Sequence, residues 1–228
     1  KAGRYVVIGG GTTATNELDY YLKNELCHFV LTGEGENKIN YLFDHIYGLG
    51  PQTPAKKGLY FKSNGVVAEV AGEPDTVSLS GNIIPTYIDL PIEEYSQAGS
   101  LNPFSRMAGQ DTPYATFQLN RGCRANCMFC GVPDYMGAGV RQIPAEETLT
   151  ELTYLVKERG IRHFEVLDDD FLGPPRLRDS VAHLLRGMGE LRQEYGITWA
   201  AGNGLIASSV TDDILRLAQD SGCLGFRI

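Results

Sequence analysis

Three of the five cysteines lie within a stretch of eight residues, and this group carries the clearest chemistry in the sequence. Cys123, Cys127 and Cys130 have the spacing C-x3-C-x2-C, with Gly122 before them and Gly131 after them. Three thiolates on one short loop can converge on one inorganic centre. Structural zinc takes four protein ligands, whereas three cysteines suit a [4Fe-4S] cluster that keeps one iron open to an outside ligand. The spacing therefore favours such a cluster.

Two other interpretations of the cysteines stay open at this point. The group could hold zinc with Cys223 or a distant histidine as the fourth ligand, or the three residues could be neighbours by chance. An odd number of cysteines, five in all, is a poor framework for disulfides and is typical of a reducing compartment. We therefore expect a cytoplasmic protein.

Composition narrows the classes of function. The chain has 228 residues, of which 43% are hydrophobic and 21% charged, and its formal net charge is −8. This balance opposes a nucleic-acid partner, which a basic surplus usually accompanies. No apolar run has the length of about 18 residues that crosses a membrane. Because the chain starts at Lys1 rather than Met and stops inside a predicted strand, we expect a fragment truncated at both ends.

The first part of the chain, residues 1–50, alternates strands and helices. Apolar patterns predict strands over 4–8 and 27–31 and helices over 16–25 and 34–48. This order is typical of a parallel α/β sheet.

Residues 51–112 have a different character. The segments 59–62 and 66–70 flank Asn64-Gly65, which predicts a β-hairpin. Many prolines and little helical periodicity follow, so we expect a linker that runs over the surface.

Residues 113–228 predict a second α/β part with repeated strand–helix units. Its helices are predicted over 145–159, 176–195 and a segment from Thr211, as N-cap, to Gly222. Repeated units of this kind suit a barrel or half-barrel. The strands are predicted over 115–119, 161–167, 197–201 and 224–228.

The cysteine loop and its surroundings resemble the radical S-adenosylmethionine superfamily. The carriers of this resemblance are the three cysteines, the lead-in Asn120-Arg121-Gly122 and the aromatic Phe129 before the last cysteine. The resemblance implies that the cysteines hold a [4Fe-4S] cluster whose open iron binds the amino and carboxylate groups of S-adenosylmethionine. It also implies that Phe129 packs near the adenine of that cofactor.

A run of acids, Asp168-Asp169-Asp170, follows the predicted strand 161–167. Strand C-terminal ends form the active face of such barrels, and the resemblance implies that polar residues here contact the amino group of S-adenosylmethionine. Three adjacent acids cannot all point inward, so we expect at least one to face solvent or cap the turn. The Gly-Gly-Glu motif that is common in the family is absent.

The N-terminal part resembles the second half of a cobalamin-binding domain. Its Gly9-Gly10 pair follows the first strand, and Gly33-Glu34-Gly35-Glu36 follows the second. The resemblance implies that Gly9 and Gly10 pass close to the tail of cobalamin, with Gly33, Glu34 and Gly35 at the same edge of the sheet. A plain Rossmann-like turn without a ligand is the alternative.

Together these resemblances imply a cobalamin-dependent radical S-adenosylmethionine enzyme, most commonly a methyltransferase. The fold implied is a partial Rossmann-like cobalamin domain followed by the first half of a radical enzyme barrel. The expected partners are a small-molecule or peptide substrate and a reductant such as flavodoxin or ferredoxin, with no nucleic acid and no membrane. The alternatives are a radical enzyme without cobalamin, similar to the methylthiotransferases, and a non-catalytic iron–sulfur or zinc module.

Overall fold

The chain forms two compact units in a computed structural model that describes residues 5–50, 52–81 and 84–228. The first unit comprises residues 1–78 and 127–137, and the second comprises 79–126 and 138–228. The second half of the cysteine loop is therefore part of the first unit. Pro51, at the predicted boundary between the first two segments, lies outside the described residues.

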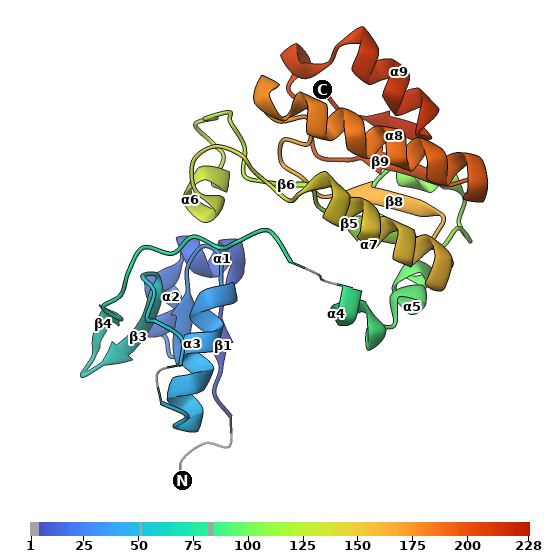
Figure 1. Ribbon diagram of the computed structural model, residues 1–228. Coiled ribbons are helices and arrows are strands. Elements are labelled where there is room, and N and C mark those ends of the chain that lie inside the picture. The colour runs from blue at the N-terminus through green and yellow to red at the C-terminus, as the bar shows by residue number, and fades with distance from the viewer. Residues whose placement is uncertain (1–4, 51, 82–83) are drawn as a thin grey trace. The chain divides into compact units, whose positions relative to one another are not determined.

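The first unit is built on a four-stranded sheet in the order β1-β2-β3-β4 (Figure 1). The strands β1 and β2 are parallel, whereas β2, β3 and β4 are antiparallel. The hairpin is confirmed, because Asn64 and Gly65 both have positive φ angles of 50° and 80°. The elements of this unit are β1 (Ile8–Gly9), α1 (Gly11–Asn16), α2 (Leu18–Lys23), β2 (Phe29–Leu31), α3 (Glu36–Tyr47), β3 (Leu59–Ser63), β4 (Val66–Glu69) and α6 (Val132–Met136).

Two predictions for this unit need correction. The strand expected over 4–8 is only β1, because Tyr5, Val6 and Val7 are exposed and lie outside it, while Arg4 is outside the described residues. The single helix expected over 16–25 is two short helices that meet at Glu17, and the first starts directly after the glycines. Local periodicity missed α1 because its buried face is a single alanine, Ala14.

A buried ion pair fastens α3 to the segment that follows the hairpin. Lys38 Nζ lies 2.8 Å from Asp75 Oδ2, and these side chains are 4% and 7% exposed. Asn37 Nδ2 donates to Asp75 Oδ1 at 2.8 Å. These partners lower the pKa of Asp75 below its usual value against the opposing effect of burial. Removing one partner of such a pair leaves a buried charge unpaired.

The second unit contains a four-stranded parallel sheet in the order β10-β9-β8-β5. The parallel α/β architecture predicted for this part is confirmed. Short strands β6 (Asn120–Arg121) and β7 (Arg141–Gln142) form a separate antiparallel pair. The other elements are β5 (Tyr114–Phe117), α7 (Ala145–Glu158), β8 (His163–Val166), η2 (Pro175–Leu177), α8 (Arg178–Tyr195), β9 (Thr198–Ala201), η3 (Ala207–Ser209), α9 (Asp212–Asp220) and β10 (Cys223–Phe226).

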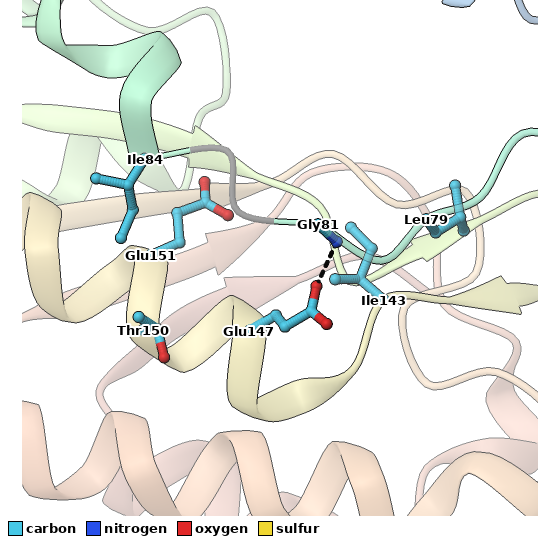
Figure 2. A pocket seen from close by; sticks show the side chains of 7 residues that line it. All are labelled: Leu79, Gly81, Ile84, Ile143, Glu147, Thr150 and Glu151. Carbon is cyan, nitrogen blue, oxygen red and sulfur yellow. Dashed lines mark hydrogen bonds between the residues drawn. The ribbon is translucent and has the colours of Figure 1, made fainter. Parts of the chain in front are cut away.

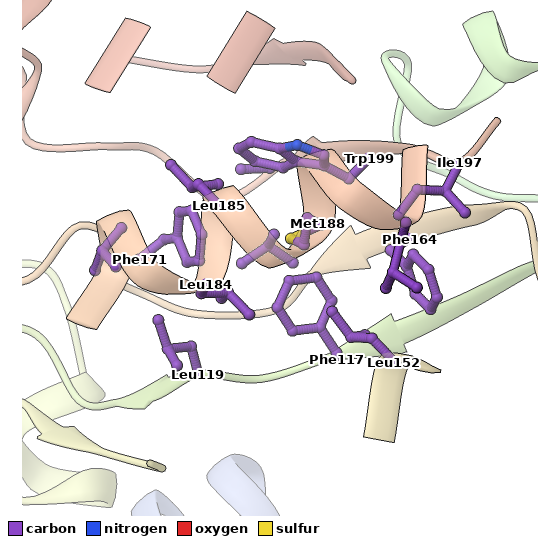
Figure 3. Packing of buried hydrophobic residues seen from close by; sticks show 14 of the residues in the cluster. Phe117, Leu119, Leu152, Phe164, Phe171, Leu184, Leu185, Met188, Ile197 and Trp199 are labelled. Carbon is purple, nitrogen blue, oxygen red and sulfur yellow. The ribbon is translucent and has the colours of Figure 1, made fainter. Parts of the chain in front are cut away.

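The core of the second unit lies between this sheet and the helices α7, α8 and α9 (Figure 3). Phe117 packs edge-on against Phe164 and Phe171, with ring centroids 6.1 and 6.4 Å apart. Phe171 in turn contacts Trp199 at 5.6 Å, and the indole donates to Ser221 Oγ at 2.9 Å. The predicted N-cap is also confirmed, since Thr211 Oγ1 accepts from the backbone N–H of Ile214.

The segment predicted as a linker is more ordered than expected. It contains α4 (Ile84–Ile88), α5 (Ile92–Gln97) and the short helix η1 (Ser105–Ala108). It also packs on the second sheet, because a Cβ at Gly225 would lie 2.5 Å from Phe104 Cδ1. The glycine of β10 therefore leaves the space that the Phe104 ring occupies, a long-range contact that local composition does not reveal.

Among the residues that the structure describes, the helices lack the combination of length and apolar character needed to span a membrane.

We expect Asp75→Asn to destabilise the first unit by about 3 kcal/mol, because it leaves Lys38 buried without its counter-ion. Hydrogen exchange of the α3 amides under increasing urea measures this loss. Glu73→Gln is the control, because Glu73 pairs with Lys56 at 3.3 Å while 78% exposed, and we expect a cost of at most about 1 kcal/mol. Equal effects of the two variants would contradict the role of the buried pair.

Candidate functional site

The cysteine loop begins where the first parallel strand of the second unit ends. β5 ends at Phe117, and Gly122 before the first cysteine has a φ of +85° that favours glycine. Cys123 Sγ accepts from the Ala125 N–H at 3.4 Å. The Cys130 N–H donates to the Cys127 carbonyl at 2.9 Å, which forms a tight turn.

None of the three cysteines of the loop forms a disulfide, and all three are at least partly open to solvent. Cys127 is exposed, and Cys123 and Cys130 are of intermediate exposure. Within the described part of the chain, no group of three or more His, Cys, Asp or Glu side chains is arranged to hold a metal ion. The assignment of the cysteines to a cluster therefore rests on their spacing and donor chemistry.

Two large apolar side chains between the last two cysteines are turned to solvent. Met128 is 100% exposed and Phe129 is 89% exposed. Exposed apolar groups at the tip of a loop that carries candidate ligands are what a binding surface offers to a flat ring. The position of Phe129 is compatible with contact to an adenine, which stays a prediction.

Asp168 is a buried acid whose carboxylate binds the end of β5. Its Oδ1 accepts from the Leu119 N–H at 2.9 Å and its Oδ2 from the Asn120 N–H at 2.7 Å. Burial raises the pKa of Asp168 to about 8, and the nearby acids Asp169 and Asp170 add to the rise, although the two N–H donors oppose it. This residue therefore connects the C-terminal end of β8 to the strand that leads into the cysteine loop.

The Asp170 side chain also binds partners inside the protein. The side chain is fully buried, its Oδ2 lies 3.1 Å from Arg124 Nε, and its Oδ1 accepts from the Gly173 N–H at 3.2 Å. Burial raises the pKa of Asp170, while the Arg124 charge and the Gly173 N–H act in the opposite direction. Its main-chain carbonyl accepts from Asn120 Nδ2 at 3.1 Å.

Asp169 is the member of the acidic run that stays available. Its exposure is intermediate, and in the part of the chain that the structure describes its carboxylate has neither a hydrogen bond nor an ion pair. Partial burial raises its pKa. This arrangement agrees with the expectation that the three adjacent acids cannot all point inward.

The glycines of the first unit meet at one edge of its sheet. Thr15 Oγ1 accepts from the Gly33 N–H at 2.9 Å and donates to the Gly11 carbonyl at 2.9 Å. One hydroxyl thus joins the glycine turn after β1 to the glycine turn after β2. Gly11 and Gly33 have φ angles of +83° and +65°, which favour glycine.

The other predicted residues at this edge have different surroundings. A Cβ at Gly9 would lie 3.1 Å from Cys27 Sγ, so packing within the unit already favours glycine there. A Cβ at Gly10 would meet nothing closer than the Leu31 carbonyl oxygen at 3.9 Å. Glu34 and Gly35 lie at the start of α3, where Gly35 is the N-cap residue.

Sequence reasoning included Asn120 in the lead-in to the cysteine loop but gave it no role of its own, and it did not single out Arg124. Asn120 is fully buried, and its side chain donates to the Phe171 carbonyl at 2.7 Å and accepts from Gln142 Nε2 at 2.9 Å. Arg124 pairs with Asp170 across 46 positions of sequence. The sequence offered one local signal for each: Arg124 is a cation next to a candidate ligand, and Asn120 is a polar residue near the end of a strand.

The second unit also contains a cavity of about 310 Å³ (Figure 2). Glu147 of α7 accepts from the Gly81 N–H at 2.7 Å at its rim. No residue of the cysteine loop or of the acidic run contributes to the lining of this cavity. Its lining residues are Leu79, Gly81, Ile84, Ile143, Glu147, Thr150 and Glu151.

Two curated proteins match the chain in sequence. An uncharacterized methyltransferase of Pyrococcus horikoshii is 27% identical over 221 residues, which is 96% of this chain and 43% of that protein. A ribosomal protein uS12 methylthiotransferase of Salinispora arenicola is 29% identical over 135 residues, or 55% of this chain and 24% of that protein. No family model matches the chain.

Two solved structures share the fold. The radical S-adenosylmethionine methyltransferase TsrM of Kitasatospora setae, with cobalamin and a [4Fe-4S] cluster bound, superposes with a TM-score of 0.70 at 16% identity over 96% of this chain. The cobalamin-dependent radical enzyme OxsB, with cobalamin and S-adenosylmethionine bound, gives 0.65 at 17% identity over the same share. At the level of the fold, the predicted likeness to cobalamin-dependent radical S-adenosylmethionine enzymes is confirmed. The chain spans 41% of the TsrM chain and 30% of the OxsB chain.

We expect Asp168→Asn to destabilise the second unit, because an amide cannot accept from two backbone N–H groups at once. In the folded protein the pKa of Asp168 is raised to about 8, whereas in the unfolded chain the carboxyl loses its proton at a lower pH. Raising the pH toward about 8 therefore lowers the contribution of Asp168 to the stability of the folded state. The stability difference between wild type and variant should therefore shrink from pH 5 to pH 8. Urea unfolding followed by fluorescence of the single tryptophan, Trp199, measures it. A difference that grows with pH would contradict the assignment.

Proposed function

We propose that this chain carries part of a cobalamin-dependent radical S-adenosylmethionine methyltransferase. In this proposal the first unit is part of a Rossmann-like cobalamin domain, and the second is the first half of the radical barrel. The observation that carries the proposal is the order of parts along one chain. A unit whose parallel strands β1 and β2 end in glycine turns precedes a C-x3-C-x2-C loop, and that loop follows β5, the first strand of a parallel sheet, after the short strand β6. The likeness of fold to TsrM and OxsB over 96% of the chain supports it.

Cys123, Cys127 and Cys130 would hold the [4Fe-4S] cluster. The donor set fits, since all three are cysteines outside any disulfide, of partial or full exposure, on a loop with glycines at both ends. When bound, the cluster and S-adenosylmethionine supply reductive cleavage of the sulfonium, which yields methionine and a 5′-deoxyadenosyl radical. Cysteines that form no disulfide would also suit a reducing, cytoplasmic location.

Asp169 and Phe129 would bind and orient S-adenosylmethionine. Asp169 is the one acid of the run whose carboxylate is not occupied by protein partners in the described residues, so it is available to a substrate ammonium. Phe129 presents an exposed ring to the adenine. Asp168 and Asp170, which the sequence grouped with Asp169, would instead hold the scaffold behind it.

Gly10 and Gly33 would let the backbone approach cobalamin closely. Gly10 is exposed, and a Cβ there would lie no nearer than 3.9 Å from the Leu31 carbonyl oxygen, while Gly33 has a backbone conformation that favours glycine. Thr15 keeps the two turns together. This arrangement supports a cofactor at that edge of the first sheet.

A methylthiotransferase-like enzyme without cobalamin is the second candidate, and the 29% identity to the uS12 methylthiotransferase favours it. The two candidates share the cluster and differ in the first unit. Cobalamin that stays bound to purified full-length protein through gel filtration supports the first candidate. Failure to bind hydroxocobalamin, with the cluster intact, supports the second.

We expect substitution of each loop cysteine by alanine to remove most of the iron and sulfide from the anaerobically reconstituted full-length protein, because three ligands are the minimum for the cluster. Cys27→Ala and Cys223→Ala are the matched controls. Cys27 is buried beside Gly9, and burial raises the pKa of Cys223 to about 11, which disfavours the thiolate that binds metal. Loss of iron in the Cys223 variant would support a closed, four-ligand centre instead.

We expect Asp169→Asn to weaken S-adenosylmethionine binding about tenfold, because a charge-assisted hydrogen bond to the cofactor's ammonium is lost. Equilibrium dialysis with labelled S-adenosylmethionine measures this, with iron content as the check that the cluster is unchanged. Asp179→Asn, an exposed acid in the first turn of α8, serves as the control. An unchanged dissociation constant in the Asp169 variant would remove this residue from the site.

A further inference from the structure

Arg124 follows the first cysteine of the loop directly, yet its side chain points back into the second unit. Its side chain is only 24% exposed, although arginine is usually open to solvent. The guanidinium makes two contacts, here called its two arms, one with the loop after β8 and one with the short helix η3 after β9. Both segments follow the C-terminal ends of strands, where the sheet would carry its active face.

The first arm is an ion pair with a buried acid. Arg124 Nε lies 3.1 Å from Asp170 Oδ2, and the Asp170 side chain has no exposed surface. Within the described residues this oxygen accepts no hydrogen bond, so the charge of Arg124 is its main compensation. A buried carboxylate is costly without a nearby cation, and Asp170 therefore holds Arg124 in place.

The second arm reaches a buried hydroxyl. Arg124 Nη2 donates to Ser209 Oγ, and that hydroxyl in turn donates to the Gly173 carbonyl at 3.4 Å. Ser209 is 7% exposed. Gly173 also donates its N–H to Asp170. The guanidinium, the carboxylate, the hydroxyl and the turn at Gly173 thus form one closed group.

We propose that Arg124 is a positioning residue for the cluster, fixing the Cys123 end of the loop to the strand ends of the second unit. The inference rests on the proposed function, because it assigns Cys123 as a ligand. Loss of a cluster to a chelator requires the ligand loop to open. A loop end that is tied by a buried ion pair and a charged hydrogen bond opens less often than a free one, so Arg124 slows this loss.

The experiment follows cluster loss from reconstituted full-length protein after addition of an iron chelator at 25 °C. The variants are Arg124→Met, Arg124→Lys, Ser209→Ala and the double variant Arg124→Met with Asp170→Asn. The melting temperature of each apoprotein is measured in parallel. The control pair is Arg216→Met with Asp213→Asn, since that ion pair at 3.2 Å is 73% and 88% exposed.

We expect Arg124→Met to lose its cluster about tenfold faster than wild type, which corresponds to the loss of a hydrogen bond to a charged group. Arg124→Lys and Ser209→Ala each keep one arm and should lie between the two. The double variant removes the unpaired buried charge, so its apoprotein melting temperature should recover while its cluster loss stays fast. This separation distinguishes positioning from a general effect on folding.

Cluster loss at the wild-type rate in Arg124→Met, or rates that follow the melting temperatures across all variants, would overturn the inference while leaving the proposed function intact. A wild-type protein that assembles no cluster overturns both. Should Arg124→Met fail to fold, the lysine and Ser209 variants decide the question by the same comparison.

Discussion

The buried carboxylates at the end of β8 are the constraint on which the arrangement of the candidate site depends. An acid in a protein interior is costly unless donors or cations surround it, and here those partners come from the stem of the cysteine loop. Asp168 accepts from the two amides that follow β5, and Asp170 pairs with Arg124. The same contacts that satisfy these two acids therefore also fix the chain next to Cys123.

The three acids of this run differ in their surroundings. Asp168 and Asp170 bind partners within the second unit, whereas the carboxylate of Asp169 has neither a hydrogen bond nor an ion pair among the described residues. In the first unit, one hydroxyl, that of Thr15, likewise binds both glycine turns. In each unit a buried or half-buried polar group organises the backbone at the C-terminal ends of parallel strands, which is where α/β sheets bind their ligands.

Much of the fold follows from patterns that are local in the sequence. The helices α3, α7 and α8, the Asn-Gly hairpin and the Thr211 cap all lie close to their predicted places, because each depends on spacing or turn chemistry within a few residues. The cysteine spacing likewise points to its chemistry without a structure. The elements that differ depend on distant partners: Phe104 of the supposed linker packs against Gly225, and Arg124 finds Asp170. Contacts over such separations leave no local periodicity to recognise.

We infer that the three loop cysteines hold a [4Fe-4S] cluster with one iron open to S-adenosylmethionine. Electron paramagnetic resonance of the reduced, reconstituted full-length protein, recorded with and without S-adenosylmethionine, tests it most directly. We expect the signal of a reduced [4Fe-4S] cluster that changes when S-adenosylmethionine is added. A cluster whose signal is unaffected, or a centre that contains zinc in place of iron, would contradict it.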